Sequence, residues 1–149
     1  MNNFLRCENL GRDIFKAWAD GNSDITAYTE PTDPYATYDA SFNYKGQSVI
    51  VELKYRKSSS TAYSTWILEQ KKYKGLELAK CRLNVKNVWY VNIFTDGNIY
   101  AWPLDEEFID ELTPVREMYR GTTAGDNTAV AKIVYHLPLD IATNLLYIN

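Results

Sequence analysis

The sequence predicts one α/β domain of the α+β type, in which helices flank a central mixed β-sheet. Three observations predict this class: an apolar period typical of a helix near the N-terminus, two hairpin signals between strand-like segments, and a helical stripe between the hairpins. Helices that alternate with strands favour a sheet covered by helices over an all-α or all-β chain. The 149 residues fit a single domain, 1–149, that is long enough to bury a core.

The N-terminal segment is expected to be a helix followed by a loop. Apolar residues within 2–19 recur at a spacing close to that of a helix, which indicates a helix that ends near Gly21. The segment 20–34 is expected to be a loop, with a short strand over 25–28.

The segments 36–44 and 47–55 are expected to form a β-hairpin. Both contain many aromatic or β-branched residues, which are common in strands. Lys45 and Gly46 lie between them, and glycine accepts the positive φ that a tight turn needs.

The rest of the chain is expected to alternate between helices and strands. Large side chains recur at helical spacing from Tyr63 to Tyr73, and Asp96-Gly97 is a hairpin signal between two apolar runs. The expected elements are a helix over 62–80, strands over 87–95 and 98–102, a short acidic helix over 103–111, an irregular segment over 115–127 with an exposed loop at 121–126, a strand over 129–137 and a short closing helix over 138–146.

Composition limits the kinds of site that the chain can carry. Its one histidine, His136, lies in an apolar stretch and is expected to be an ordinary strand residue, so multi-histidine metal sites are excluded. Two cysteines cannot form a four-ligand zinc site alone. No apolar run approaches the roughly 20 residues needed to cross a bilayer, and the N-terminus does not resemble a signal peptide. We expect a reduced, intracellular (cytoplasmic) chain without a membrane partner.

Charge is unevenly distributed along the chain. The net charge is −3, but residues 54–86 carry nine Lys or Arg and two acids, a local charge of +7. A basic segment in an acidic chain is typical of a surface that binds the phosphates of nucleic acid. It is equally typical of a solvated helix face, and charge alone favours neither interpretation.

Two acids are expected to meet across the first hairpin. With Lys45 and Gly46 as the turn, Asp39 lies directly opposite Glu52, and the Cα atoms of such a pair are about 5 Å apart. Opposed carboxylates repel one another, and a divalent cation between them reverses that interaction. Mg²⁺ prefers oxygen ligands and commonly takes one or two carboxylates with water and phosphate oxygens.

A lysine completes this cluster. Lys54 follows Glu52 by two residues, so strand alternation places both on one face of the sheet. An ammonium there can hold an attacking water or offset the negative charge that grows on a phosphate. Asp39, Glu52 and Lys54 are therefore the candidate catalytic residues. The simpler interpretation is a surface strand with a Glu and Lys pattern.

The segments Tyr38-Asp39-Ala40 and Val51-Glu52-Leu53-Lys54-Tyr55-Arg56 resemble the Asp…(Asp/Glu)-x-Lys signature of the PD-(D/E)xK nuclease superfamily, which includes restriction endonucleases and Holliday-junction resolvases. The resemblance covers roughly residues 8–98. It implies a restriction endonuclease-like core and a Mg²⁺-dependent nuclease, with Mn²⁺ as a substitute ion. No proline precedes Asp39, so Asp33, which precedes a proline, is an alternative first acid; the hairpin register favours Asp39.

The resemblance also implies individual roles. The metal ligands would be Asp39, Glu52 and the carbonyl oxygen of Leu53. Three more residues match positions with catalytic roles in the superfamily: Lys54, Gln70 and Glu8. Gln70 is also the polar interruption of the helical stripe, so it is expected to point inward.

Basic residues near the candidate site are expected to contact nucleic acid. Arg56 and Lys57 directly follow the catalytic strand, so they would pass near a bound substrate. Lys71, Lys72 and Lys74 on the following helix would either face phosphates or be merely solvated, and the sequence supports both interpretations equally.

The function that these features favour is metal-dependent hydrolysis of phosphodiester bonds in nucleic acid, with DNA as the favoured substrate. Repair, recombination, restriction and phage DNA metabolism are processes that such an enzyme would serve. One alternative is a module of the same fold that binds nucleic acid or protein without cleavage. Another is a small assembly protein whose Tyr-rich strands form an interface. A domain of this size is also compatible with a homodimer.

Overall fold

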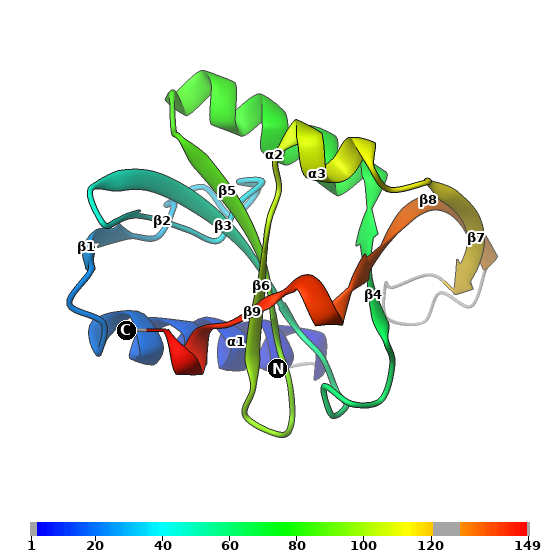
Figure 1. Cartoon of the computed structure of the whole chain (residues 1–149), viewed down its shortest axis with the longest axis horizontal. Coiled ribbons are helices and arrows are strands. Elements are labelled where there is room, and N and C mark those ends of the chain that lie inside the picture. The colour runs from blue at the N-terminus through cyan, green and yellow to red at the C-terminus, as the bar shows by residue number, and fades with distance from the viewer. Residues whose placement is uncertain (1–2, 121–128, 149) are drawn as a thin grey trace.

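The central layer of the protein is a mixed β-sheet between helices (Figure 1). The structure is a computed structural model that describes residues 3–120 and 129–148. Within these residues the sheet order is β1-β2-β3-β5-β6-β9. Its strands are β1 (Ile25–Thr29), β2 (Ala40–Tyr44), β3 (Gln47–Tyr55), β5 (Asn87–Ile93), β6 (Ile99–Pro103) and β9 (Thr143–Asn144). β3 and β5 pair in parallel and the other neighbours antiparallel, which confirms the predicted class.

Helices and a second, antiparallel sheet cover the central layer. In Figure 1, α1 lies below the central strands, α2 lies above them, and the sheet of order β4-β8-β7 lies to the right. These elements are α1 (Asn3–Asp20), β4 (Thr65–Glu69), α2 (Gln70–Leu83), α3 (Glu106–Asp110), β7 (Val115–Arg120), β8 (Ala129–Pro138) and the 3-10 turns Leu139–Ile141 and Leu145–Tyr147. Among the described residues, none of these helices has both the length and the apolar character needed to span a membrane.

Side-chain alternation along β3 divides the interior into two hydrophobic cores. Val49 points toward α1 and packs in one core with Phe15. Ile50 points the other way and packs in the second core with Leu76 of α2. Glu52 follows Ile50 by two residues, so alternation places it on the α2 face of the sheet. The polar residues near the C-terminal end of β3 therefore lie on the same face of the sheet as the buried Ile50.

The first hairpin forms at the predicted turn. Lys45 and Gly46 have φ angles of 50° and 80°, and positive φ at both positions is typical of a two-residue hairpin turn. The register is the predicted one up to the pair Ala40 and Val51, where the ladder ends. The strand predicted over 36–44 is therefore too long at its beginning.

The helix predicted over 62–80 is wrong in its first part. Residues 65–69 form β4, and α2 begins only at Gln70. Trp66 and Leu68 are buried on one face of β4, which pairs along its whole length with β8. Pairing with a strand more than 60 residues downstream therefore decides the conformation, although the large side chains also match a helical spacing.

The C-terminal third differs from the prediction in two places. The segment 115–127 was expected to be irregular, but 115–120 form β7 because they pair with β8. The exposed loop predicted at 121–126 lies outside the described residues. The closing helix predicted over 138–146 is replaced by 3-10 turns on either side of β9, which pairs with β6. The predicted strand before it corresponds to β8, and the short acidic helix corresponds to α3.

Candidate functional site

Asp39 lies where the β2–β3 ladder ends. Its N–H donates to the carbonyl oxygen of Val51 at 2.8 Å, so the predicted ladder pair of Asp39 with Glu52 does not form. Its carboxylate reaches across to β3 instead, where Oδ2 accepts a hydrogen bond from the N–H of Leu53 at 2.7 Å. This bond fixes the Asp39 carboxylate against the residue that follows Glu52.

The carboxyl groups of Asp39 and Glu52 nevertheless come together. Their side chains are only 13% and 14% exposed. Burial, and then the negative charge of Asp39, raise the pKa of Glu52 to about 8, and a hydrogen bond between the two carboxyl groups acts in the same direction. A pair of carboxylates held this close is unfavourable unless a proton or a cation neutralises part of its charge.

Two basic side chains supply part of that neutralisation. Nη2 of Arg12, on α1, lies 2.9 Å from Oδ1 of Asp39, and Nζ of Lys72, on α2, lies 3.2 Å from Oε1 of Glu52. Arg12 comes within reach because α1 packs closely on the end of β3. A Cβ added at Gly11 would lie 3.4 Å from the Cβ of Tyr55, which leaves little room for a larger residue there.

Lys54 lies on the same face of β3 as Glu52. Its side chain is exposed, but partial burial of its ammonium, and then the positive charge of Arg56, lower its pKa. The charge of Glu52 acts on it in the opposite direction. The structure therefore brings Asp39, Glu52 and Lys54 to one end of β3, with Lys54 on the side open to solvent.

The interactions of Gln70 and Glu8 are with residues other than Asp39 and Glu52. Gln70 is the first residue of α2, and its Nε2 donates to the hydroxyl of Tyr135 at 3.1 Å. Glu8 is exposed one helical turn before Arg12, and its charge acts on that guanidinium. Glu8 is thus linked to the site through Arg12. The catalytic roles assigned to Gln70 and Glu8 stay predictions.

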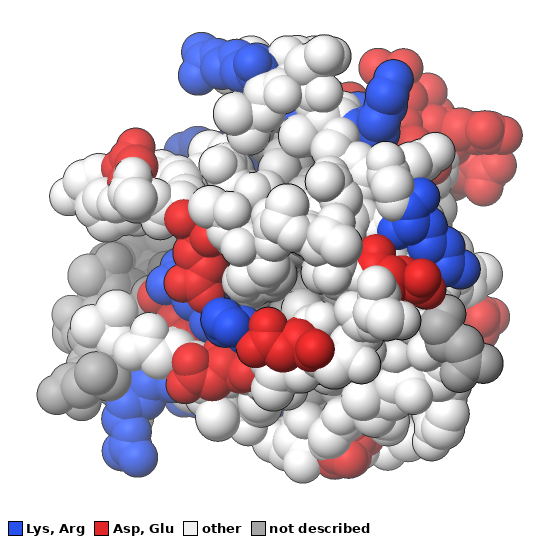
Figure 2. All heavy atoms as spheres, turned by 90° about the vertical axis from the view of Figure 1, so that its left-hand side faces the viewer, with Lys and Arg blue, Asp and Glu red and all other residues white. Residues whose placement is uncertain are grey.

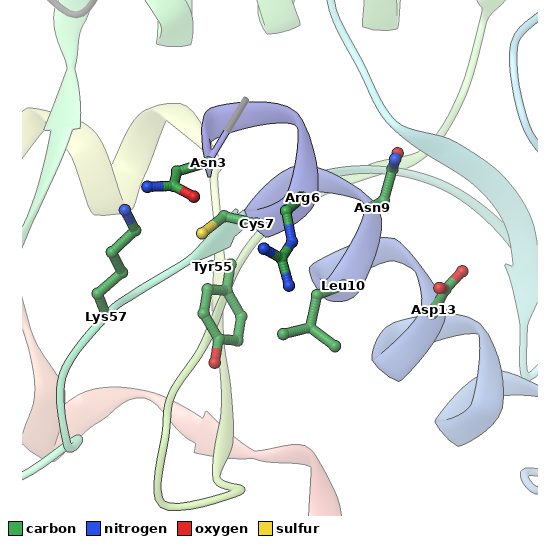
Figure 3. Close-up of a pocket in the computed structure, with 8 residues that line it drawn as sticks. All are labelled: Asn3, Arg6, Cys7, Asn9, Leu10, Asp13, Tyr55 and Lys57. Atoms are coloured by element: carbon green, nitrogen blue, oxygen red, sulfur yellow. The ribbon is translucent and has the colours of Figure 1, made fainter. Parts of the chain in front are cut away.

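Arg56 and Lys57 are neighbours in sequence but lie in different environments. The Arg56 guanidinium is directed into the protein, where it donates to Oδ1 of Asn92 at 2.6 Å and to the carbonyl oxygen of Ile67 at 2.8 Å. These bonds occupy donors that a phosphate contact would need. Lys57 is exposed and lines a groove with Arg6 of α1 beside the ring of Tyr55 (Figure 3).

The face of the protein that carries β1 and β2 is not uniformly basic (Figure 2). Figure 2 shows the face with β1 and β2, where acidic and basic side chains lie next to one another. Lys71 and Lys74 on α2 are exposed, as a phosphate contact requires. Contact with nucleic acid stays a prediction for Lys57 and for both of these lysines.

The donor set at Asp39 and Glu52 fits a hard divalent cation. Among residues 3–120 and 129–148, no group of three or more His, Cys, Asp or Glu side chains is placed to hold a metal ion. Mg²⁺, however, is commonly bound by one or two carboxylates and completes its shell with water and phosphate oxygens. Burial, and then the negative charge of Asp39, raise the pKa of Glu52, and a cation bound to both carboxylates would offset the second of these causes.

Arg12 and Lys72 are the site residues that the sequence did not single out. Arg12 belongs to a helix whose packing on β3 depends on tertiary structure. The sequence does not separate Lys72 from Lys71 and Lys74, because the direction of its side chain depends on where α2 begins. Once the helix is known to begin at Gln70, Lys72 is in its first turn, near the polar end of β3.

Comparison with known proteins identifies the fold. No protein-family model matches the sequence, and no curated protein matches it either. The structure is similar to that of Hjc, a Holliday junction resolvase from the archaeal hyperthermophile Archaeoglobus fulgidus. The TM-score is 0.53 and the sequence identity 11%, over 93% of this chain and 95% of the resolvase chain. At this identity the likeness shows the fold alone, and that fold is the restriction endonuclease-like core implied by the PD-(D/E)xK resemblance.

Proposed function

We propose that this chain, whose fold is that of the PD-(D/E)xK nucleases, is a metal-dependent nuclease that hydrolyses phosphodiester bonds in DNA. The observation that carries the proposal is the convergence of two largely buried carboxylates and a lysine at one end of β3. A fold alone does not specify an activity, so the argument depends on this cluster.

The proposed roles follow from the position of each side chain. Asp39 and Glu52 would bind Mg²⁺ or Mn²⁺, with the carbonyl oxygen of Leu53 as a further ligand. A cation bound there would stabilise the charge that develops on the phosphate. The hydrogen bond from the N–H of Leu53 keeps one oxygen of Asp39 in a fixed direction, which limits the ways in which the carboxylate can turn.

Lys54 is proposed to act on the water or on the phosphate. Lys54 is exposed and shares a face of β3 with Glu52, so a phosphodiester bound to the metal could reach it. A lysine with a lowered pKa releases its proton more readily, so Lys54 can hydrogen-bond the attacking water as well as offset negative charge on a phosphate oxygen. Lys57, Lys71 and Lys74 are proposed to contact the nucleic-acid backbone.

One observation favours the alternative of a binding module without catalysis. Each carboxylate already has a basic partner: Arg12 for Asp39 and Lys72 for Glu52. Such pairs are what we expect in a protein of this fold that does not bind a metal ion. Lys54 belongs to neither pair. Burial and then the positive charge of Arg56 lower its pKa, and the negative charges of Glu52 and Glu69 offset this only in part. A purely structural cluster would not need a lysine in that position.

The test is a nuclease assay of the purified chain on single-stranded, duplex and four-way junction DNA. The similar resolvase makes branched DNA the first substrate to try. We expect cleavage in Mg²⁺ or Mn²⁺ and none in excess chelator. Asp39→Asn is expected to be inactive, whereas Asp20→Asn, which removes an exposed partner of Lys16 on α1, is expected to retain activity.

Equal cleavage with and without chelator would contradict metal dependence. Duplex or junction binding without cleavage in any of the divalent ions would favour the binding module instead. Assignment to the cytoplasm and a homodimeric state are separate predictions, and neither outcome of the assay bears on them.

A further inference from the structure

Lys72 enters the candidate metal site from the opposite side to Arg12. Its ammonium contacts Oε1 of Glu52 at 3.2 Å, and its side chain is 43% exposed, compared with 14% for that of Glu52. The lysine stem therefore extends from the solvent-facing side of α2 to a buried carboxylate.

The charge of Lys72 is stabilised by the whole carboxylate pair. Its ammonium lies 3.2 Å from Oε1 of Glu52, and the carboxylate of Asp39 lies beside that of Glu52, so Lys72 lies in the field of both carboxylates. A divalent cation that bridges the two would be placed in the same field.

The Lys72 ammonium and a divalent metal ion cannot both stay in contact with Glu52. A metal ion bound to Glu52 would lie close to the Lys72 ammonium, and like charges at such short separation repel strongly in a partly buried site. Lysine can leave, because it is a compact charge on a flexible four-carbon stem and Lys72 is already partly exposed. Once displaced, its ammonium would be free to contact a phosphate of a substrate bound at the metal.

We propose that Lys72 is a positioning residue that exchanges with the metal ion: it pairs with Glu52 in the metal-free protein and turns to the nucleic-acid backbone when the metal binds. This inference rests on the proposed function. It makes the affinities for metal and for nucleic acid interdependent, because each ligand favours the same displaced position of Lys72. Lys72 thereby keeps the empty carboxylate pair neutralised without permanently blocking it.

The test measures Ca²⁺ binding to the full chain by calorimetry, with and without a short four-way junction DNA. This readout is independent of DNA cleavage. Lys72→Met is compared with wild type and with Lys86→Met, an exposed lysine in the connection between α2 and β5. Without DNA, we expect Lys72→Met to bind Ca²⁺ at least about 5-fold tighter than both. Junction DNA should tighten Ca²⁺ binding to wild type by about 5-fold or more, and by clearly less in Lys72→Met.

A second variant separates this role from a purely structural one. Lys72→Gln removes the charge but keeps a polar side chain that can hydrogen-bond Glu52, so it should tighten Ca²⁺ binding in the same direction even if Lys72→Met folds poorly. Unchanged or weaker Ca²⁺ binding in a folded Lys72 variant would overturn the exchange while leaving the nuclease proposal intact. If neither Ca²⁺ nor Mn²⁺ binds to wild type or to any variant, the metal site itself is wrong and both proposals fail.

Discussion

Glu52→Gln is expected to reduce the rate of metal-dependent DNA cleavage by about 10³-fold or more, and also to stabilise the metal-free protein at alkaline pH. The loss of rate follows because glutamine cannot supply the negative charge that a bridging divalent cation requires. The gain in stability follows because the carboxylate is buried beside Asp39, and this environment raises its pKa to about 8. Activity and stability should therefore move in opposite directions.

The stability difference should depend on pH in a defined way. The folded protein holds the Glu52 proton more tightly than the unfolded chain, in which the pKa is 4.5. The free energy of unfolding therefore falls as pH rises from about 4.5 through about 8, and Glu52→Gln lacks this fall. Since one pKa unit corresponds to about 1.4 kcal/mol, the wild-type loss from this group is on the order of a few kcal/mol.

Denaturant unfolding in chelator, below and above this pH window, measures the effect. Glu111→Gln, at the exposed C-terminal end of α3, is the matched control and should keep the wild-type pH dependence. If Glu52→Gln and wild type changed in parallel with pH, Glu52 would not be a destabilising carboxylate. The raised pKa of Glu52 would then not support a metal site at this position.

Arg56→Met is expected to lower the free energy of unfolding by about 3 kcal/mol, as the loss of a buried, charge-assisted hydrogen-bond network does. The guanidinium joins β3, β4 and β5, since it bonds Asn92 and the carbonyl oxygen of Ile67 and also donates to the hydroxyl of Tyr90 at 3.1 Å. Asn92 is fully buried, so its side-chain oxygen would lose this partner without access to water.

Thermal or denaturant unfolding compares Arg56→Met with Lys57→Met, the same change one residue later at an exposed position. We expect the Lys57 variant to lie within about 0.5 kcal/mol of wild type, as is usual for surface substitutions. Equal stabilities for the two variants would show that the Arg56 network is not structural. Arg56 would then again be a candidate for contact with nucleic acid.

The parts of the fold that the sequence predicts correctly are those set by short-range chemistry. The positions of Lys45 and Gly46 define a two-residue turn, and alternation along 47–55 then fixes which side chains share a face. The Glu52 and Lys54 part of the candidate site follows from this alternation alone. The approach of Asp39 to Glu52 is predicted only in outline. The ladder ends one pair earlier, and the Asp39 carboxylate is held instead by a hydrogen bond from the N–H of Leu53.

The parts that the sequence does not predict depend on distant partners. The segment from Tyr63 to Tyr73 matches a helical stripe, and only pairing with β8 makes its centre a strand. Lys72 and Arg56 show the same limit at the level of single side chains. Nothing local distinguishes Lys72 from its neighbours on α2, or an inward Arg56 from the exposed Lys57.

The most direct measurement of the proposed metal site is the anomalous scattering of Mn²⁺ in crystals of the protein. We expect one Mn²⁺ bound by an oxygen of Asp39 and an oxygen of Glu52, each about 2.1 Å away, as for a hard octahedral cation. Lys72 should then no longer contact Glu52. A crystal grown in Mn²⁺ that retained the Arg12–Asp39 and Lys72–Glu52 pairs, with no metal between the carboxylates, would contradict the site on which the proposed nuclease activity depends.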